Sequence, residues 1–481
     1  MSTEAALLRA IRETPEDDTA RLVYADLVEE EGDPDRGEFI RVQIALANTP
    51  ETDPARRALE DREHELLAEH ESRWLGVPTD SDGLTAWQFV RGFVDDVSAT
   101  PNFMLNEGSD LCAVNPVRRW RVQSSQQEMP EDLLEAGRRS WFSRLEAINL
   151  TDWFQSIGEL ERFLTRSDFA RLRELDLTDC HGFDDLPEIL DRTDFRGRLK
   201  VLRIGGGHIG TFLDTQMLAR VLTPSQLTEL SVRSCGLDAA DARRLLSSEC
   251  CQELTILDIS DNHIAPDAWD TFRDSKCRLR SLDLSGTPLG AISLEDVLRQ
   301  DSLSELRVLN LNRCGSAMAN IRALSASRYW AQAEELRMRG GTIPEHSLDP
   351  LFTSVGSPNL RVLDMGENYF RDVGVAGLCN AKWADSLTWL DLSQNYLTDR
   401  ALYSLAESDR SQNLRTLNLA FNNNYDQPGA DYDDRITDTG LRALVESPHL
   451  TNLRNLDLRG IRFHDETRSA LQARFGNRLR E

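Results

Sequence analysis

The sequence lacks the signals of a membrane-spanning or secreted protein. It contains no run of 18 apolar residues, and its first residues, MSTEAALLRAIRETPEDD, include no basic start followed by a long apolar stretch. Cysteine is sparse, with eight residues in 481 and no CxxC pair, unlike the dense disulfide framework of a small secreted scaffold. We therefore expect a cytoplasmic protein that does not bind membranes.

Positive charge is also in short supply. Lys and Arg total 55 against 81 Asp and Glu, which gives a formal net charge of -26. A surface of that sign repels phosphate backbones, so we expect no nucleic-acid partner. The chain is too long for one compact core, and its 40% hydrophobic residues are ordinary for a folded protein. The sequence thus predicts several domains or a repeat array.

Motifs of catalysis are absent as well. The sequence has no H-x-x-x-H, H-E-x-x-H, G-x-S-x-G or phosphate-loop pattern. Carboxylates between Asp17 and Asp35 could bind a metal or act as acid and base, but Asp and Glu are expected on solvated helix faces, and no His or Cys joins them. We predict no catalytic residue, no cofactor and no metal site. An enzyme with its site in the N-terminal helical segment remains the lesser alternative.

A repeat dominates the rest of the chain. The motif L-x-x-L-x-L occurs twelve times, with first positions at Leu145, Leu172, Leu199, Leu227, Leu254, Leu279, Leu306, Ala333, Leu360, Leu387, Leu414 and Leu453. Most steps are 27 residues, and the last step of 39 residues equals one period plus a 12-residue insertion. A weaker thirteenth copy begins at Val117. A period of this length indicates one strand and one helix in each unit.

The remaining positions of each unit support that assignment. Three residues after the motif the chain has Asn or Cys, which we expect to bond to loop backbone or to fill space: Cys180, Cys235, Asn262, Cys314, Asn368, Asn395 and Asn422. Leu402 and Leu405 then share one face of a predicted helix, with Thr398 or Asp399 as its N-cap. The fold class is therefore an α/β solenoid with parallel strands on the concave face and helices on the convex face.

Two parts of the chain resemble known families. The repeats resemble the long, ribonuclease-inhibitor-like class of leucine-rich repeats over about three quarters of the sequence. The run Asp18 to Glu30, followed by Gly32-Asp33-Pro34 and Glu38 to Arg41, resembles the bacterial repeat-companion domain, a short helical module found ahead of repeat arrays. This second resemblance implies a bacterial origin and an architecture, but no activity.

These observations divide the chain into four expected parts. Residues 1–75 form an all-helical domain, 76–114 a linker and N-terminal cap, 115–463 about thirteen repeats, and 464–481 a C-terminal capping helix. In the last part Leu471, Phe475 and Leu479 are spaced by four residues, as on one face of a helix.

The predicted binding site lies on the concave face. The residue between the second and third apolar positions points out of the sheet, because strand side chains alternate. From this position we select Asp364, Asp391 and Asp457, and from the position just before the second leucine Trp389, as the aromatic anchor. Tyr425 and Tyr432, in the insertion, could also contact a partner, although a solvated loop is about equally compatible.

The predicted function is a non-enzymatic, cytoplasmic protein-interaction scaffold. An acidic concave face would favour a basic protein or peptide as partner. The alternative is a substrate-recognition or sensor subunit whose catalytic component is encoded separately. The sequence does not indicate an oligomeric state.

Overall fold

The computed structural model describes residues 3–50, 55–123, 130–154, 156–180, 185–206, 213–223, 226–265, 272, 275, 277–289, 293–315, 317–423 and 435–481. The chain forms two compact units. The first contains Met1–Thr211 with Pro224–Gln226, and the second contains Phe212–Thr223 with Leu227–Glu481.

The first unit begins with four helices: α1 (Thr3–Glu13), α2 (Asp18–Glu30), α3 (Pro34–Asn48) and α4 (Arg56–Leu75). Asp17 caps α2 through the backbone N–H of Thr19, and Asp33 caps α3 through that of Arg36. A shared core holds α1, α2 and α3 together with Phe93 from the following segment: Leu8, Ile11, Tyr24, Ala25, Val28, Ile40, Ile44 and Phe93.

A hairpin connects these helices to the repeats. Strands β1 (Leu84–Val90) and β2 (Phe93–Ala99) pair antiparallel through a turn at Arg91 and Gly92, both with positive φ. A Cβ at Gly92 would lie 2.5 to 2.9 Å from atoms of Ile40 in α3, so only glycine permits this approach. After α5 (Pro101–Asn106) and α6 (Gly108–Val114), β3 (Arg119–Val122) pairs parallel with β2 and begins the repeat sheet.

The first unit continues with repeats in which each strand pairs parallel with the next, from β3 to β6. The elements are α7 (Pro130–Ala136), the 3-10 turn η1 (Phe142–Arg144), β4 (Ala147–Asn149), α8 (Ile157–Arg166), β5 (Glu174–Thr178), α9 (Leu186–Asp191) and β6 (Val201–Gly205).

The second unit consists of repeats alone. Its elements are α10 (Thr215–Val221), β7 (Glu229–Arg233), α11 (Ala239–Ser247), β8 (Ile256–Asp258), β9 (Ser281–Asp283), α12 (Ser293–Leu298), β10 (Val308–Asn310), α13 (Ala317–Ala326), β11 (Glu335–Arg337), α14 (Asp349–Thr353), β12 (Val362–Asp364), α15 (Arg371–Asn380), β13 (Trp389–Asp391), α16 (Asp399–Glu407), β14 (Thr416–Asn418), α17 (Asp438–Glu446), β15 (Asn455–Asp457), α18 (Asp465–Phe475) and β16 (Leu479–Arg480). Short 3-10 turns precede several strands.

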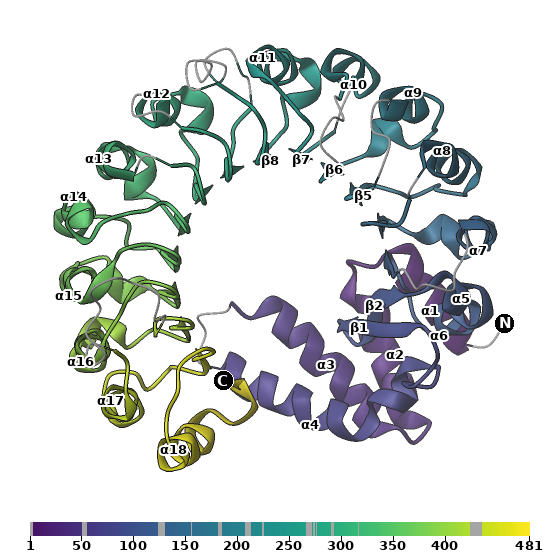
Figure 1. Cartoon of the computed structure of the whole chain (residues 1–481). Helices are drawn as coiled ribbons and strands as arrows, with labels where there is room; N and C mark the ends of the chain where they lie inside the picture. Colours follow the sequence, from purple (N-terminus) through teal and green to yellow (C-terminus); the bar gives the residue numbers. More distant parts are fainter. Residues whose placement is uncertain are drawn as a thin grey trace. The chain divides into compact units, whose positions relative to one another are not determined.

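Adjacent strands of this unit are in register at the repeat spacing, as in the pairs of Leu363 with Leu390 and Leu390 with Leu417. The strands line the inner side of an arc and the helices its outer side (Figure 1). The motif leucines are buried, with Leu336, Leu417 and Leu419 fully inaccessible. The expected α/β solenoid with parallel strands inside and helices outside is confirmed.

The Asn and Cys column bonds to backbone, as expected. The Nδ2 groups of Asn262, Asn368, Asn395 and Asn422 each donate to a carbonyl 30 residues earlier, at 2.8 to 3.0 Å. The thiols of Cys180 and Cys314 donate to the equivalent carbonyls of Leu150 and Leu284, at 3.0 and 3.1 Å. Cysteine therefore keeps one bond of the asparagine ladder.

The residue before this column has a left-handed backbone in repeat after repeat. Positive φ occurs there at Asp152, Asp179, Gly206, Ser234, Asp261, Gly286, Arg313, Gly340, Glu367, Gln394, Phe421 and Gly460. The chain leaves each strand through this conformation, which directs it towards the helical side of the unit.

The C-terminal segment differs in detail from the expected single helix. Leu471 and Phe475 in α18 are buried against the last repeat, but the helix ends at Phe475, and Gly476 has a φ of +56°. Leu479 lies in β16, where it pairs with Leu456 of β15. The four-residue spacing of Leu471, Phe475 and Leu479 predicted one continuous helix and did not indicate the change to a strand after Phe475.

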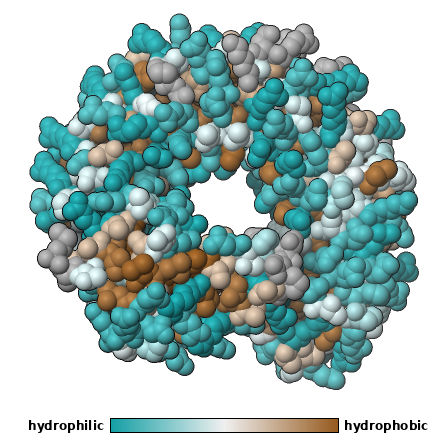
Figure 2. Space-filling model, turned by 180° about the vertical axis from the view of Figure 1, so that it is seen from behind, coloured by the Kyte–Doolittle hydropathy of each residue, from teal (hydrophilic) through white to brown (hydrophobic). Residues whose placement is uncertain are grey.

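The surface is mostly polar. The face in Figure 2 is mainly hydrophilic, with hydrophobic residues gathered across its lower part. None of the helices in the described ranges is long and apolar enough to cross a lipid bilayer.

Candidate functional site

The candidate site is the strand face of the second unit. We use this name for the side chains that extend from its strands away from the leucine core. Most residues between the second and third leucines are Asp or Asn, and their Oδ1 atoms accept the backbone N–H two residues later, at 2.8 to 3.2 Å: Asp258, Asp283, Asn310, Asp364, Asp391, Asn418 and Asp457. These side chains stabilise the exit from each strand.

The second oxygen of several carboxylates bonds to the neighbouring strand. Asn310 donates to Asp283 and Asn418 donates to Asp391, both at 2.7 Å, and the Ser231 hydroxyl donates to Asp258 at 2.8 Å. The column is therefore a hydrogen-bonded ladder across strands.

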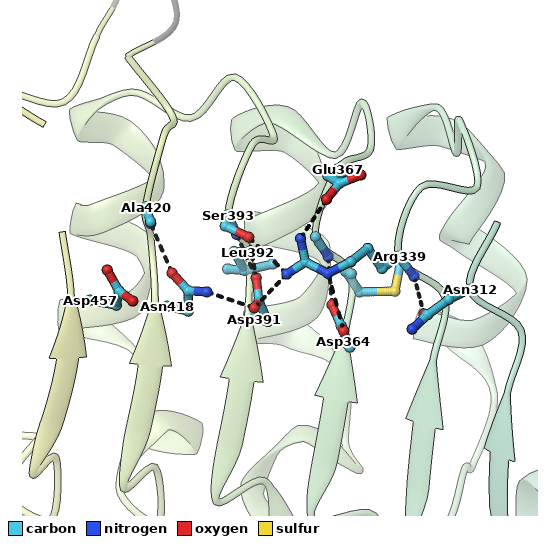
Figure 3. A network of polar contacts seen from close by, with 12 residues as sticks. Asn312, Arg339, Asp364, Glu367, Asp391, Leu392, Ser393, Asn418, Ala420 and Asp457 are labelled. Atoms are coloured by element: carbon cyan, nitrogen blue, oxygen red, sulfur yellow. Dashed lines mark hydrogen bonds and ion pairs between the residues drawn. The ribbon is translucent and has the colours of Figure 1, made fainter. Parts of the chain in front are cut away.

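Arg339 is the centre of the largest network on this face, which Figure 3 shows. Its Nη2 donates to Asp391 Oδ2 at 2.7 Å and to Ser393 Oγ at 3.0 Å, its Nη1 to Glu367 Oε1 at 2.9 Å, and its Nε to Asp364 Oδ2 at 3.4 Å. We call this group the arginine hub. One cation thus neutralises carboxylates from two adjacent strands and one loop.

Asp364, Asp391 and Asp457 are consequently not open to solvent. They are 4%, 3% and 9% exposed, and Arg459 covers Asp457 at 2.7 Å. Burial raises the pKa of Asp364, and the nearby Asp391 raises it further. The expectation of an open acidic wall is wrong at these positions. Strand alternation identified the side of the sheet, but it did not reveal that Arg339, Arg459 and Asn418 cover the carboxylates.

Trp389 lies on β13, half-buried, in register with Val362 and Thr416 on the adjacent strands. The Arg337 guanidinium lies 5.6 Å from the ring centroid, a cation–π contact, and also pairs with Glu335. Trp389 therefore keeps an exposed edge beside a cation. Tyr425 and Tyr432 lie outside the described residues.

A row of arginines beside the strand face, one residue before each strand, was missed from the sequence. It occupies the position directly after the first leucine, at Arg280, Arg307, Arg361, Arg415 and Arg454, and we call it the basic edge. The side chains of Arg280 and Arg307 are 65% and 42% exposed. Arg361 and Arg415 are exposed, and neither guanidinium has a hydrogen bond or ion pair to the described part of the chain. The 27-residue spacing could have identified this row.

Between Leu279 and Gly460, the strands, together with the residue before and the three residues after each, are less acidic than the whole protein. Their basic residues are Arg280, Arg307, Arg313, Arg337, Arg339, Arg361, Arg415, Arg454 and Arg459. Their acidic residues are Asp283, Glu334, Glu335, Asp364, Glu367, Asp391 and Asp457. These repeats thus contribute nine cations and seven carboxylates in a chain of net charge -26, and three of the carboxylates are buried.

No group of three or more His, Cys, Asp or Glu side chains in the described ranges could hold a metal ion. The cysteines at described positions are unpaired thiols, and all but Cys379 are buried. The chemistry visible on the strand face is therefore that of charge and hydrogen bonding.

Comparison with known proteins supports the repeat assignment. The profile of the family described as Leucine Rich repeat matches residues 250–268 and 356–379. The ribonuclease inhibitor of Sus scrofa is 31% identical over 164 residues, which are 32% of this chain and 36% of that protein. The match thus spans about a third of the inhibitor's length.

Two solved structures are similar at greater distance. A chain in the crystal structure of the Rad7 and Elc1 complex in yeast is 16% identical, with 97% of this chain and 96% of that chain covered and a TM-score of 0.47. An internalin from Listeria monocytogenes is 16% identical, with 72% and 87% covered and a TM-score of 0.38. The parallel strand order and the buried motif leucines show that the fold of the chain is an α/β leucine-rich-repeat solenoid.

Proposed function

We propose that this protein is a non-enzymatic, cytoplasmic scaffold that binds a protein or peptide partner on the strand face of its second unit. A leucine-rich-repeat fold favours protein binding, because it exposes a long row of side chains that its own core does not use. The helical segment 3–75 would act as a repeat-companion module of bacterial type, as residues 18–41 suggest.

The partner that fits this face is acidic, because the exposed charges are arginines. The burial of Asp364 and Asp391 removes the reason for expecting a basic partner. Arg361 and Arg415 lie two strands apart, at a separation of about 10 Å, and can contact successive carboxylates of an extended acidic segment. Trp389, on the strand between them, supplies the aromatic contact. Tyr425 and Tyr432 remain predicted contacts from the insertion.

The observation that supports this proposal most directly is that the carboxylates of the strand face are covered, whereas Arg361 and Arg415 of the adjacent basic edge are exposed. It is tested with the double substitution Arg361→Glu and Arg415→Glu. We expect it to abolish capture of acidic proteins in pull-downs from the native host at moderate salt, and capture by the wild type to decrease as salt increases.

The matched control is Arg322→Glu with Arg400→Glu, which makes the same charge change on exposed positions of helices α13 and α16. The control should retain the wild-type partners. Equal capture by both double variants would contradict binding on the strand face. Co-purification of a stable complex with an enzyme would favour the alternative role of a recognition subunit.

A further inference from the structure

A small pocket in the first unit has a different chemistry from the strand face. It lies where α1, the end of α6, the start of β3 and the turn η1 meet. Its lining residues are Arg12, Cys112, Asn115, Pro116, Val117, Arg118, Trp141 and Arg144, and we call it the arginine pocket. The cavity itself measures only about 10 Å³, roughly the space of one water molecule, and it opens to solvent. A ligand could therefore place only one small group at its mouth.

The pocket is rich in hydrogen-bond donors that lack acceptors. Arg12 Nε and the indole Nε1 of Trp141 are buried atoms without a hydrogen-bond partner. Arg12 uses Nη2 to bond the Ala113 carbonyl, whereas the Arg144 guanidinium has no hydrogen bond or ion pair to the residues that the structure describes. A buried donor without an acceptor destabilises the fold, so two of them in one pocket call for an explanation.

The charge of the pocket is not balanced from within. Arg118 is neutralised by Asp95 and by Glu16, whose Oε1 lies 2.8 Å from Nη1. For Arg12 the strongest influence is burial, which lowers its pKa, and the next is the neighbouring cation Arg144, which lowers it further. Burial raises the pKa of the Cys112 thiol to about 12, so this group remains neutral and provides no counter-charge at neutral pH.

We propose that the arginine pocket binds a small oxyanion, a carboxylate or phosphate group, between the guanidinium groups of Arg12 and Arg144. Such an anion accepts from both guanidiniums at once and removes their mutual repulsion. Pro116 and Val117 make part of the lining apolar, which lowers the local polarity and strengthens these bonds. The site is separate from the strand face, so this proposal does not depend on the proposed partner.

The proposal is tested by thermal unfolding of the full chain in sodium chloride, sodium acetate or sodium phosphate at equal ionic strength. A ligand that binds the folded state raises Tm in proportion to its saturation. We expect phosphate, acetate or both to raise Tm of the wild type. An effect of phosphate alone that Arg144→Gln loses identifies a phosphate group as the ligand, and an effect of both salts that Arg144→Gln loses identifies a general oxyanion site.

The variant is Arg144→Gln, and the matched control is Arg139→Gln, an exposed arginine beside η1 that does not line the pocket. Arg144→Gln should weaken anion affinity at least about tenfold in titration calorimetry, since a charge-assisted hydrogen bond is lost. In chloride alone Arg144→Gln should unfold at the same temperature as Arg139→Gln or higher, because a repelling charge has been removed.

Both readouts distinguish a ligand site from a structural role. A Tm of Arg144→Gln well below that of Arg139→Gln in chloride would assign Arg144 to fold stability and overturn the proposal. An equal rise of Tm with phosphate in both variants would also overturn it, because phosphate stabilises folded proteins generally by exclusion from their surface.

Discussion

The arginine hub of the second unit and the arginine pocket of the first unit place guanidinium groups in opposite surroundings. All four hydrogen-bond partners of the Arg339 guanidinium are oxygen acceptors, and the cation holds two strands and a loop together. Around Arg12 the pocket contains further donors, and the nearest influential charge is another arginine. A buried cation with its anions in place serves stability, whereas one without them is available to a ligand.

Removal of the Arg339 charge is the strongest way to break this comparison. Arg339→Met keeps an apolar stem but leaves Asp364 and Asp391 buried without their main counter-ion. The strand face would then hold unbalanced negative charge, as the pocket holds unbalanced positive charge. We expect a loss of about 3 kcal/mol in the free energy of unfolding, measured by urea denaturation. Arg313→Met is the control, because the Arg313 side chain is 70% exposed and its ion pair with Glu367 is long, at 3.5 Å. Its cost should be below about 1 kcal/mol, and equal costs would contradict the role of the hub.

The asparagine ladder, made of Asn262, Asn368, Asn395 and Asn422, sharpens the comparison. Here buried backbone groups are satisfied by neutral side chains and not by charged ones. Asn368 donates to Met338, Met365 and Gly366 and accepts the backbone N–H of Ile343. Asn368→Ala should cost about 2–3 kcal/mol in the free energy of unfolding, because these backbone groups remain buried and unpaired. Asn368→Cys should cost about 1 kcal/mol less, since Cys180 and Cys314 keep the bond to the preceding repeat. Equal losses in the two variants would show that the thiol bond contributes nothing.

The smallest expected effect concerns a carboxylate on the helical side. Burial acts to raise the pKa of Asp438, but the Thr467 side chain and then the backbone N–H and imidazole of His464, at 2.9 and 2.7 Å, outweigh it, and the pKa is lowered to about 2. A lowered pKa stabilises the folded state above the unfolded value near 4, and that contribution is lost as pH decreases towards 2.

Asp438→Asn should therefore cost about 1 kcal/mol at pH 7 and nothing near pH 2, as measured by urea denaturation across this range. A difference from the wild type that does not change with pH would indicate that shape, and not charge, matters at this position.

The solenoid could be predicted from the sequence because it depends on a local period. The leucine triplets, the Asn and Cys column and the helix after Thr398 recur at fixed spacing, and the structure confirms the strand register that this spacing implies. The polar column was also placed on the correct side of the sheet. The exposure of Asp391 could not be predicted, because it is set by Arg339, which is 52 residues away in sequence.

The arginine pocket was beyond prediction for a related reason. Arg12 comes from the first helix, whereas Trp141 and Arg144 follow more than a hundred residues later, without any motif between them. Only the packing of α1 against the first repeats brings these donors together. The basic edge was different, since its arginines follow the same period as the leucines and were open to prediction from the sequence.

The left-handed backbone at the end of each strand has a practical consequence. Eight of these positions hold residues other than glycine, among them Asp152, Ser234, Arg313 and Gln394, although a left-handed conformation costs an ordinary L-residue about 1–2 kcal/mol. Asparagine tolerates this conformation better than most residues. An engineer could therefore introduce it at one repeat after another and adjust the thermal tolerance of the array in small increments, without altering the side chains of the basic edge.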